Sequence, residues 1–200
     1  MNGLFAPIRL FRLVLLGLAL GLAGCAHQVS FQDVGYSTGA QRTGMGIVVV
    51  IDQDTLNRKT SIRSAMTGLA HNWEVEPGQM LKQVADIELP QMFDPYEQVS
   101  GDGESRSNGR SLILEMTVPG YDFADFRATI TVRAIARAPT GRVLFDKTYT
   151  EQGDTQGGKM FWGGAFAMKS AIRQSSLDAY QKIFQALRGD LNNALRSGAA

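Results

Sequence analysis

The stretch FRATITVRAIARAPTGRVLFDKTYT, residues 126–150, carries the clearest structural pattern in this 200-residue chain. Apolar residues occupy every second position from 126 to 136, and the positions between them hold Arg or Thr, apart from Ile135. Because successive side chains of a strand point to opposite faces, this alternation predicts a strand with one buried face and one basic, solvated face. Residues 138–141 predict a turn, and the alternation resumes over 142–150. The stretch is therefore predicted to form an antiparallel hairpin.

The elements on either side of this hairpin indicate the fold class. A β-branched run at 47–51 predicts a buried strand, residues 79–93 predict a helix that Pro90 ends, and residues 112–118 predict another strand, closed by Pro119-Gly120. Residues 97–110 predict a loop. Residues 165–195 predict a long helix, because large apolar residues recur there at steps of three and four. These residues are Leu177, Tyr180, Phe184, Leu187, Leu191 and Leu195. The element order predicts an α+β fold, a two-layer sandwich in which helices cover one face of a mainly antiparallel sheet.

The N-terminus has the pattern of a secretory leader. Arg9 and Arg12 precede an apolar run at 13–23, and no acidic residue occurs before Asp33. The run matches the ~7–15 residues of a signal-peptide core and is shorter than the roughly 20 residues that span a bilayer. It ends in Leu22-Ala23-Gly24-Cys25, which contains the chain's single cysteine. A secreted protein with an incidental cysteine is the alternative interpretation.

The motif Leu22-Ala23-Gly24-Cys25 resembles the lipobox of bacterial lipoproteins at every position. The resemblance implies cleavage after Gly24 and lipidation of Cys25, which makes the protein lipid-anchored. Ala26 stands where an Asp favours inner-membrane retention, so the expected location is the outer membrane, with the domain facing the periplasm. The domain boundaries predicted are a signal peptide at 1–24, a lipidated flexible tether at 25–45 and a single α+β domain at 46–197.

Charge and cysteine content narrow the functional classes. Loss of residues 1–24 leaves 18 Lys plus Arg against 19 Asp plus Glu. A nearly neutral chain lacks the basic footprint of a nucleic-acid-binding protein, so no nucleic acid partner is expected. With Cys25 lipidated, no thiol remains for a disulfide or a metal site.

Catalytic signals are sparse, and the chain is predicted not to be an enzyme, with no cofactor and no metal site. Asp52 and Asp54 follow a buried strand, and His71 lies at a predicted turn. These three residues are the candidates for the alternative hypothesis, a periplasmic hydrolase or metal-dependent enzyme. Residues 153–160 fit the phosphate-loop spacing G-x-x-x-x-G-K. We interpret that match as coincidental, because Met160 stands where a phosphate loop has Ser or Thr.

An aromatic cluster beside two glycines is the predicted contact site. Met160, Phe161, Trp162 and Phe166 surround Gly163-Gly164 after a polar loop at 151–159. Aromatic and Met side chains suit a protein-binding patch, and Trp also suits a membrane interface. Packing of these residues into the core is the alternative.

The leader, the element order and the stretch 127–195, with its polar turn at 139–144 between two alternating strands, resemble small α+β envelope lipoproteins. These are the YajG-like, LptE-type and CsgG/PelC-type families. The resemblance implies a non-catalytic accessory that binds a protein partner in envelope biogenesis or in export. The CsgG/PelC type adds a further alternative, a homo-oligomeric, ring-forming subunit of a secretion complex. Beyond Cys25, no functional residue carries over.

Overall fold

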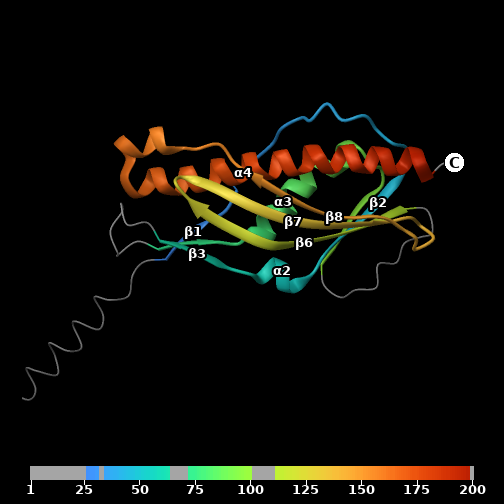
Figure 1. Ribbon diagram of the computed structural model, residues 1–200, viewed down its shortest axis with the longest axis horizontal. Coiled ribbons are helices and arrows are strands. Elements are labelled where there is room, and N and C mark those ends of the chain that lie inside the picture. The colour runs from blue at the N-terminus through green and yellow to red at the C-terminus, as the bar shows by residue number, and fades with distance from the viewer. Residues whose placement is uncertain (1–25, 32–33, 64–71, 101–110, 199–200) are drawn as a thin grey trace, which may run out of the picture.

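A five-stranded sheet forms the centre of the fold (Figure 1). The structure is a computed structural model, and it describes residues 26–31, 34–63, 72–100 and 111–198. The strand order is β5-β2-β6-β7-β8. The bounds are β2 Gly46–Ile51, β5 Tyr96–Ser100, β6 Ser111–Ala124, β7 Arg127–Arg137 and β8 Val143–Gln152. The predicted hairpin is confirmed: β7 and β8 pair antiparallel around the turn at 138–142.

The predicted alternation is also confirmed on β7. Its even-numbered residues from Ala128 to Ala136 are all buried, and the residues between them are exposed or partly so. The outer face differs from the expected basic face. Arg133 forms hydrogen bonds of 2.9 and 2.6 Å with Asp146, and Arg137 pairs with Glu115 at 2.9 Å. Acidic residues of the neighbouring strands therefore balance these two arginines.

Helices cover the buried face of the sheet. The helix α3, Pro77–Glu88, packs on β6 and continues into a 3-10 turn, Leu89–Gln91, while α4, Gly157–Gly198, lies across β7 and β8 along the length of the molecule. The predicted stripe of α4 is confirmed, since its four middle members, Tyr180 to Leu191, are fully buried. A short helix α2, Gln53–Asn57, follows β2. The α+β sandwich with a long C-terminal helix is thus observed.

A second, smaller sheet adds three strands in the order β1-β4-β3. Its strands are β1 Ala26–Val29, β3 Thr60–Arg63 and β4 Asn72–Val75. The strand β1 pairs parallel with β4, and β3 pairs antiparallel with it. Trp73 and Val75 of β4 are buried in the common core.

Two sequence-based boundaries need correction, and the sheet is mixed. The strand β6 does not end at Pro119-Gly120 but passes it with a register shift between Thr117 and Gly120 and reaches Ala124. A bulge tolerates a proline and a glycine that a regular ladder excludes. Residues 97–100, the start of the predicted loop, belong to the edge strand β5, which pairs parallel with β2. The parallel pairs of β2 with β5 and β6 make the sheet mixed, although its longer ladders are antiparallel.

The predicted flexible tether is the largest correction. Its residues 34–45, together with β1 and Phe31, form a segment that packs along the helices, here called the strap. Val29 and Phe31 are buried in the core, and the backbone amide of Thr43 donates to the carbonyl of Met92 at 2.8 Å. Hydrogen bonds from side chains and backbone hold the polar residues of the strap, so this segment is ordered without a regular spacing of apolar residues.

Candidate functional site

The predicted contact residues fall in the first turns of α4. The helix begins at Gly157 and passes through Gly163-Gly164, so the predicted helix start at 165 is wrong. Met160, Phe161, Trp162 and Phe166 therefore lie on helical backbone, and their side chains lie outside the described part of the structure. Cys25 also lies outside the described residues, one position before β1 begins.

The candidates for an enzyme are not brought together among the described residues. Asp52 caps α2: its carboxylate accepts hydrogen bonds from the backbone amide and the hydroxyl of Thr55, at 2.5 and 3.1 Å. Asp54 is exposed in the first turn of the same helix, and His71 lies outside the described residues. Within the described ranges, no three His, Cys, Asp or Glu side chains are grouped so that they could hold a metal ion. Asp52 thus has a structural role that its position after a strand explains.

The glycine that opens the phosphate-loop-like match serves close packing. A Cβ at Gly153 would lie 1.8 Å from the carbonyl oxygen of Ser175 on α4. The Ser175 hydroxyl accepts a hydrogen bond from the amide of Ala128, at 2.9 Å, and the amide of Gly153 donates to the Ala128 carbonyl. Gly153 therefore lets the end of β8 approach α4.

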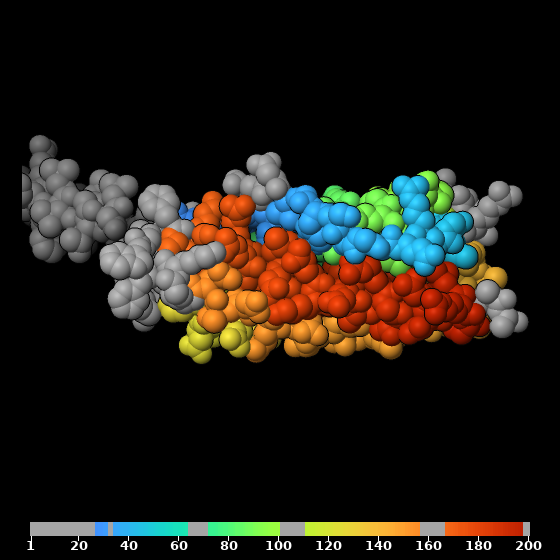
Figure 2. Space-filling view, turned by 90° about the horizontal axis from the view of Figure 1, so that it is seen from above, coloured from blue at the N-terminus to red at the C-terminus, as the bar shows by residue number. Residues whose placement is uncertain are grey.

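The strap runs along α4 in the same direction as the helix. Phe31 and Val34 lie beside residues 170–177, Tyr36 lies beside Arg188, and Met45 lies beside Ala194 and Leu195. Figure 2 shows the strap, in light blue, side by side with α4, in red. The strap therefore connects the end of the molecule that follows Cys25 with the opposite end.

A buried ion pair fastens the strap between the two long helices. The Glu88 side chain of α3 is only 2% exposed and forms a salt bridge with Arg188 of α4. Tyr36 of the strap donates its hydroxyl to Glu88 Oε1 at 3.0 Å. Burial, reinforced by the negative charge of Glu88, raises the pKa of the Tyr36 hydroxyl well above its usual value, so the phenol stays a donor. Next to it, Gln91 accepts from the amide and the hydroxyl of Thr38 at 2.8 and 3.0 Å.

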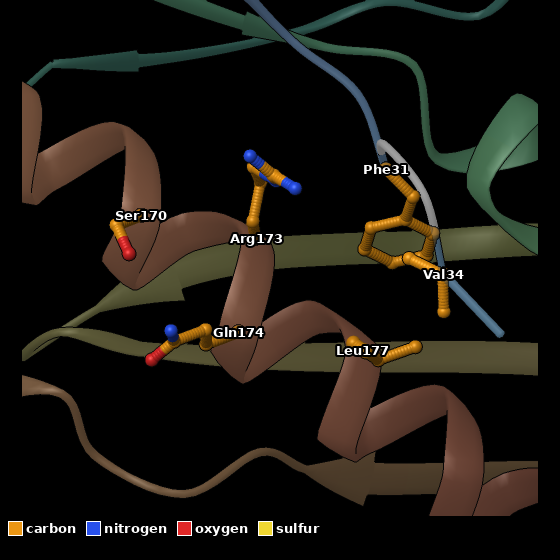
Figure 3. Close-up of a pocket in the computed structure, with 6 residues that line it drawn as sticks. All are labelled: Phe31, Val34, Ser170, Arg173, Gln174 and Leu177. Atoms are coloured by element: carbon orange, nitrogen blue, oxygen red, sulfur yellow. The ribbon is translucent and has the colours of Figure 1, made fainter. Parts of the chain in front are cut away.

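Two pockets lie along the strap. The first, the strap pocket, holds about 140 Å³ between the strap and α4 (Figure 3). Phe31, Val34 and Leu177 form its apolar side, and one face of α4 supplies polar groups. These are the side chains of Ser170, Arg173 and Gln174. Arg173 and Gln174 already have interaction partners.

The second pocket lies at the other end of the molecule and is here called the tip pocket. It holds about 120 Å³, and the end of the strap, the β7–β8 turn and the last turns of α4 enclose it. Its lining residues are Met45, Leu112, Ala138, Pro139, Arg142, Leu144, Ala194 and Leu195. The sequence alone did not identify it, because its walls come from four segments that only the tertiary fold brings together.

Comparisons with known proteins give distant structural likenesses. A hypothetical protein, CT253, from Chlamydia trachomatis shares 7% identity, with a TM-score of 0.41, over 74% of this chain and 99% of that one. A protein provisionally described as a lipoprotein from Caulobacter crescentus shares 14% identity, with a TM-score of 0.32, over 56% and 81% of the two chains. No family model matches the sequence, and no curated protein matches it. At these TM-scores the likenesses assign the chain neither to a family nor to an activity. Among the described residues, no helix is long and apolar enough to cross a membrane.

Proposed function

We propose that this chain is a lipid-anchored, non-catalytic lipoprotein of the outer membrane that binds a protein partner in envelope biogenesis or export. The motif Leu22-Ala23-Gly24-Cys25 after a short apolar leader supports the anchor. Asp52, a candidate of the competing enzyme hypothesis, caps α2, which gives this residue a structural role.

The observation that carries the proposal is the position of β1. The strand begins at Ala26, the residue directly after Cys25, and pairs in register with β4. A lipid on Cys25 is therefore joined to the fold without a linker. One residue spans at most about 3.6 Å, so the acylated residue holds the start of β1 close to the bilayer surface.

The same geometry supports a position of the predicted contact residues close to the membrane. The strap begins beside the N-terminal half of α4, so the first turns of α4 lie toward the anchored end of the molecule (Figure 1). Met160, Phe161, Trp162 and Phe166 occur in these turns. Met and aromatic residues at this height suit either the lipid interface or a partner that is itself in the membrane.

Metabolic labelling tests the anchor. Cells that express the full chain are grown with radiolabelled palmitate, and the wild type is compared with Cys25→Ser and with the matched control Ala26→Ser. We expect label and membrane association in the wild type and the control, and neither in Cys25→Ser. Palmitate incorporation that survives Cys25→Ser would refute lipidation at this residue.

A crosslinking experiment tests the binding role separately. Phe161 and Trp162 are changed together to Ser, and complexes are crosslinked in intact cells and identified by mass spectrometry. We expect loss of a specific envelope partner while circular dichroism and palmitate labelling stay at wild-type levels. Unchanged recovery of the partner would exclude this end of α4 as the contact.

A self-assembling, ring-forming subunit is the second candidate, and one observation favours it. Within the described residues, β5 and β8 are the outer strands of the five-stranded sheet, and each is paired on one side only. Open edges of this kind can join the sheets of neighbouring copies. Native mass spectrometry of the lipoprotein released from detergent decides the point, since a monomer would exclude this candidate.

A further inference from the structure

The tip pocket has the size and composition of a receptor for one apolar side chain. All but one of its eight lining residues are apolar, and Leu112 at its base is 2% exposed. An apolar cavity of ~150 Å³ accommodates a benzene molecule. An open pocket of about 120 Å³ is therefore large enough for a single ring or a branched aliphatic group, but not for a long acyl chain.

Arg142 makes the rim of this pocket positively charged. The other arginines near the hairpin turn are paired, Arg133 with Asp146 and Arg137 with Glu115. Arg142 is exposed, and its guanidinium has no hydrogen bond or ion pair with another described residue. A guanidinium next to an apolar hollow can form a charge-assisted hydrogen bond with a carboxylate.

The turn itself holds Arg142 in this position. Gly141 adopts a φ of 83°, its amide donates to the Ala138 carbonyl at 2.8 Å, and the Ala138 amide donates back to the Arg142 carbonyl at 2.8 Å. These two backbone hydrogen bonds close the turn. They use no side-chain atom of Arg142, which lines the pocket. The turn therefore fixes the backbone of Arg142 relative to the apolar residues of the pocket.

We propose that the tip pocket binds a segment of a partner protein in which an apolar side chain stands next to a carboxylate. The apolar group enters the hollow between Pro139, Leu144 and Leu195, and the carboxylate pairs with Arg142. The strap pocket is a weaker candidate, since its Arg173 and Gln174 are already engaged. The tip pocket lies about 33 Å along α4 from Arg173, at 1.5 Å per residue, so it faces away from the anchored end.

A titration with two small probes tests the proposal. The full lipoprotein, in nanodiscs and with labelled Leu methyl groups, is titrated with N-acetyl-phenylalanine, which is anionic at pH 7, and with its neutral amide. We expect saturable shifts of the Leu112, Leu144 and Leu195 methyl signals, with tighter binding of the anion. Leu81, a buried residue of α3 that does not line the tip pocket, provides the internal reference.

Variants separate the two parts of the site. Arg142→Gln should weaken binding of the anion by about two- to fivefold, the range of an exposed ion pair, and leave the amide unchanged. Ala194→Leu should fill the hollow and reduce binding of both probes. The matched control is Arg63→Gln, an exposed arginine on β3. The reference spectrum reports whether each variant is folded, and Ala138→Leu replaces Ala194→Leu if that variant unfolds.

Three results would overturn the proposal. These are no saturable shift at the tip with either probe, equal affinity of Arg142→Gln and the wild type for the anion, or tighter binding of octanoate than of N-acetyl-phenylalanine. The last result would assign the pocket to a lipid. The binding chemistry does not depend on Cys25, so failed palmitate labelling and a failed titration are distinct outcomes.

Discussion

Removal of Arg188 is the sharpest test of how the strap is held. In Arg188→Met, the apolar stem of residue 188 is retained, but the carboxylate of Glu88 loses its cation. The Glu88 side chain is 2% exposed and the Arg188 side chain 20% exposed, so water cannot replace the lost partner without rearrangement. The Tyr36 hydroxyl then donates to a carboxylate that has no cation beside it, while Gln91 still holds Tyr36 and Thr38 through their backbone.

The expected cost follows from this burial. Breaking a buried ion pair by deleting one partner typically costs about 3–5 kcal/mol, because an uncompensated charge remains. For a domain of this size, each kcal/mol lowers Tm by roughly 2–4 °C. We therefore expect Tm to fall by about 6–20 °C.

The assays are thermal unfolding, which gives Tm, and urea unfolding at pH 7, which gives the free energy of unfolding, with hydrogen exchange of residues 34–45 measured alongside them. The double variant Glu88→Gln, Arg188→Met removes the stranded charge and keeps an acceptor for Tyr36, so it should recover much of the lost stability. Arg133→Met is the matched control, because its ion pair with Asp146 is exposed and should matter little. A single variant as stable as this control, or a double variant no more stable than the single, would refute the reasoning.

Three further predictions concern local packing and charge. Asp52→Ala should destabilise the protein by about 0.5–2 kcal/mol through loss of the α2 cap, measured by urea unfolding, whereas an effect below this range would deny the cap its role. Gly189→Ala should stabilise α4 by about 0.5–1 kcal/mol, since a Cβ there meets nothing within 4 Å, while Gly153→Ala should destabilise the fold because its Cβ meets the Ser175 backbone. Equal effects of the two would contradict the packing. Lys147, hydrogen-bonded at 2.5 Å, lowers the pKa of Asp190, so the stability from this pair should be complete above pH about 4 and be lost as the pH falls through the folded-state pKa. Asp190→Asn should flatten this acid limb of the unfolding profile, and an unchanged limb would exclude the pair as its source.

The sequence predicted the parts of the fold that rest on periodicity. The alternation from 126 to 150 was sufficient to predict the hairpin, and the apolar stripe was sufficient to predict α4. In a strand or a helix with one buried face, apolar residues recur at the period of that element. Periodicity could not indicate the strap. Its Thr and Tyr residues are held by Gln91 and Glu88, which lie some fifty positions away in the sequence.

The site was less accessible to prediction for the same reason. Glu88 occupies the buried face of α3, and only its pairing with Arg188 explains this position of a charged residue. A helix of 42 residues continues through Gly163 and Gly164 despite their low helix propensity, so the sequence placed its start too late. The residues of the tip pocket carry no common motif at all.

The absence of a linker between Cys25 and β1 has a consequence for how copies meet. In the proposed form with an acylated Cys25, all copies would share one plane, and each would point the same end toward the bilayer. Copies then meet in two dimensions and in the same orientation. This raises the effective concentration of the sheet edge of one copy for the sheet edge of the next. With this proposed anchoring, an edge-to-edge contact too weak to be populated in dilute solution would be populated on the membrane, and a partner arriving from the solvent would reach the tip first.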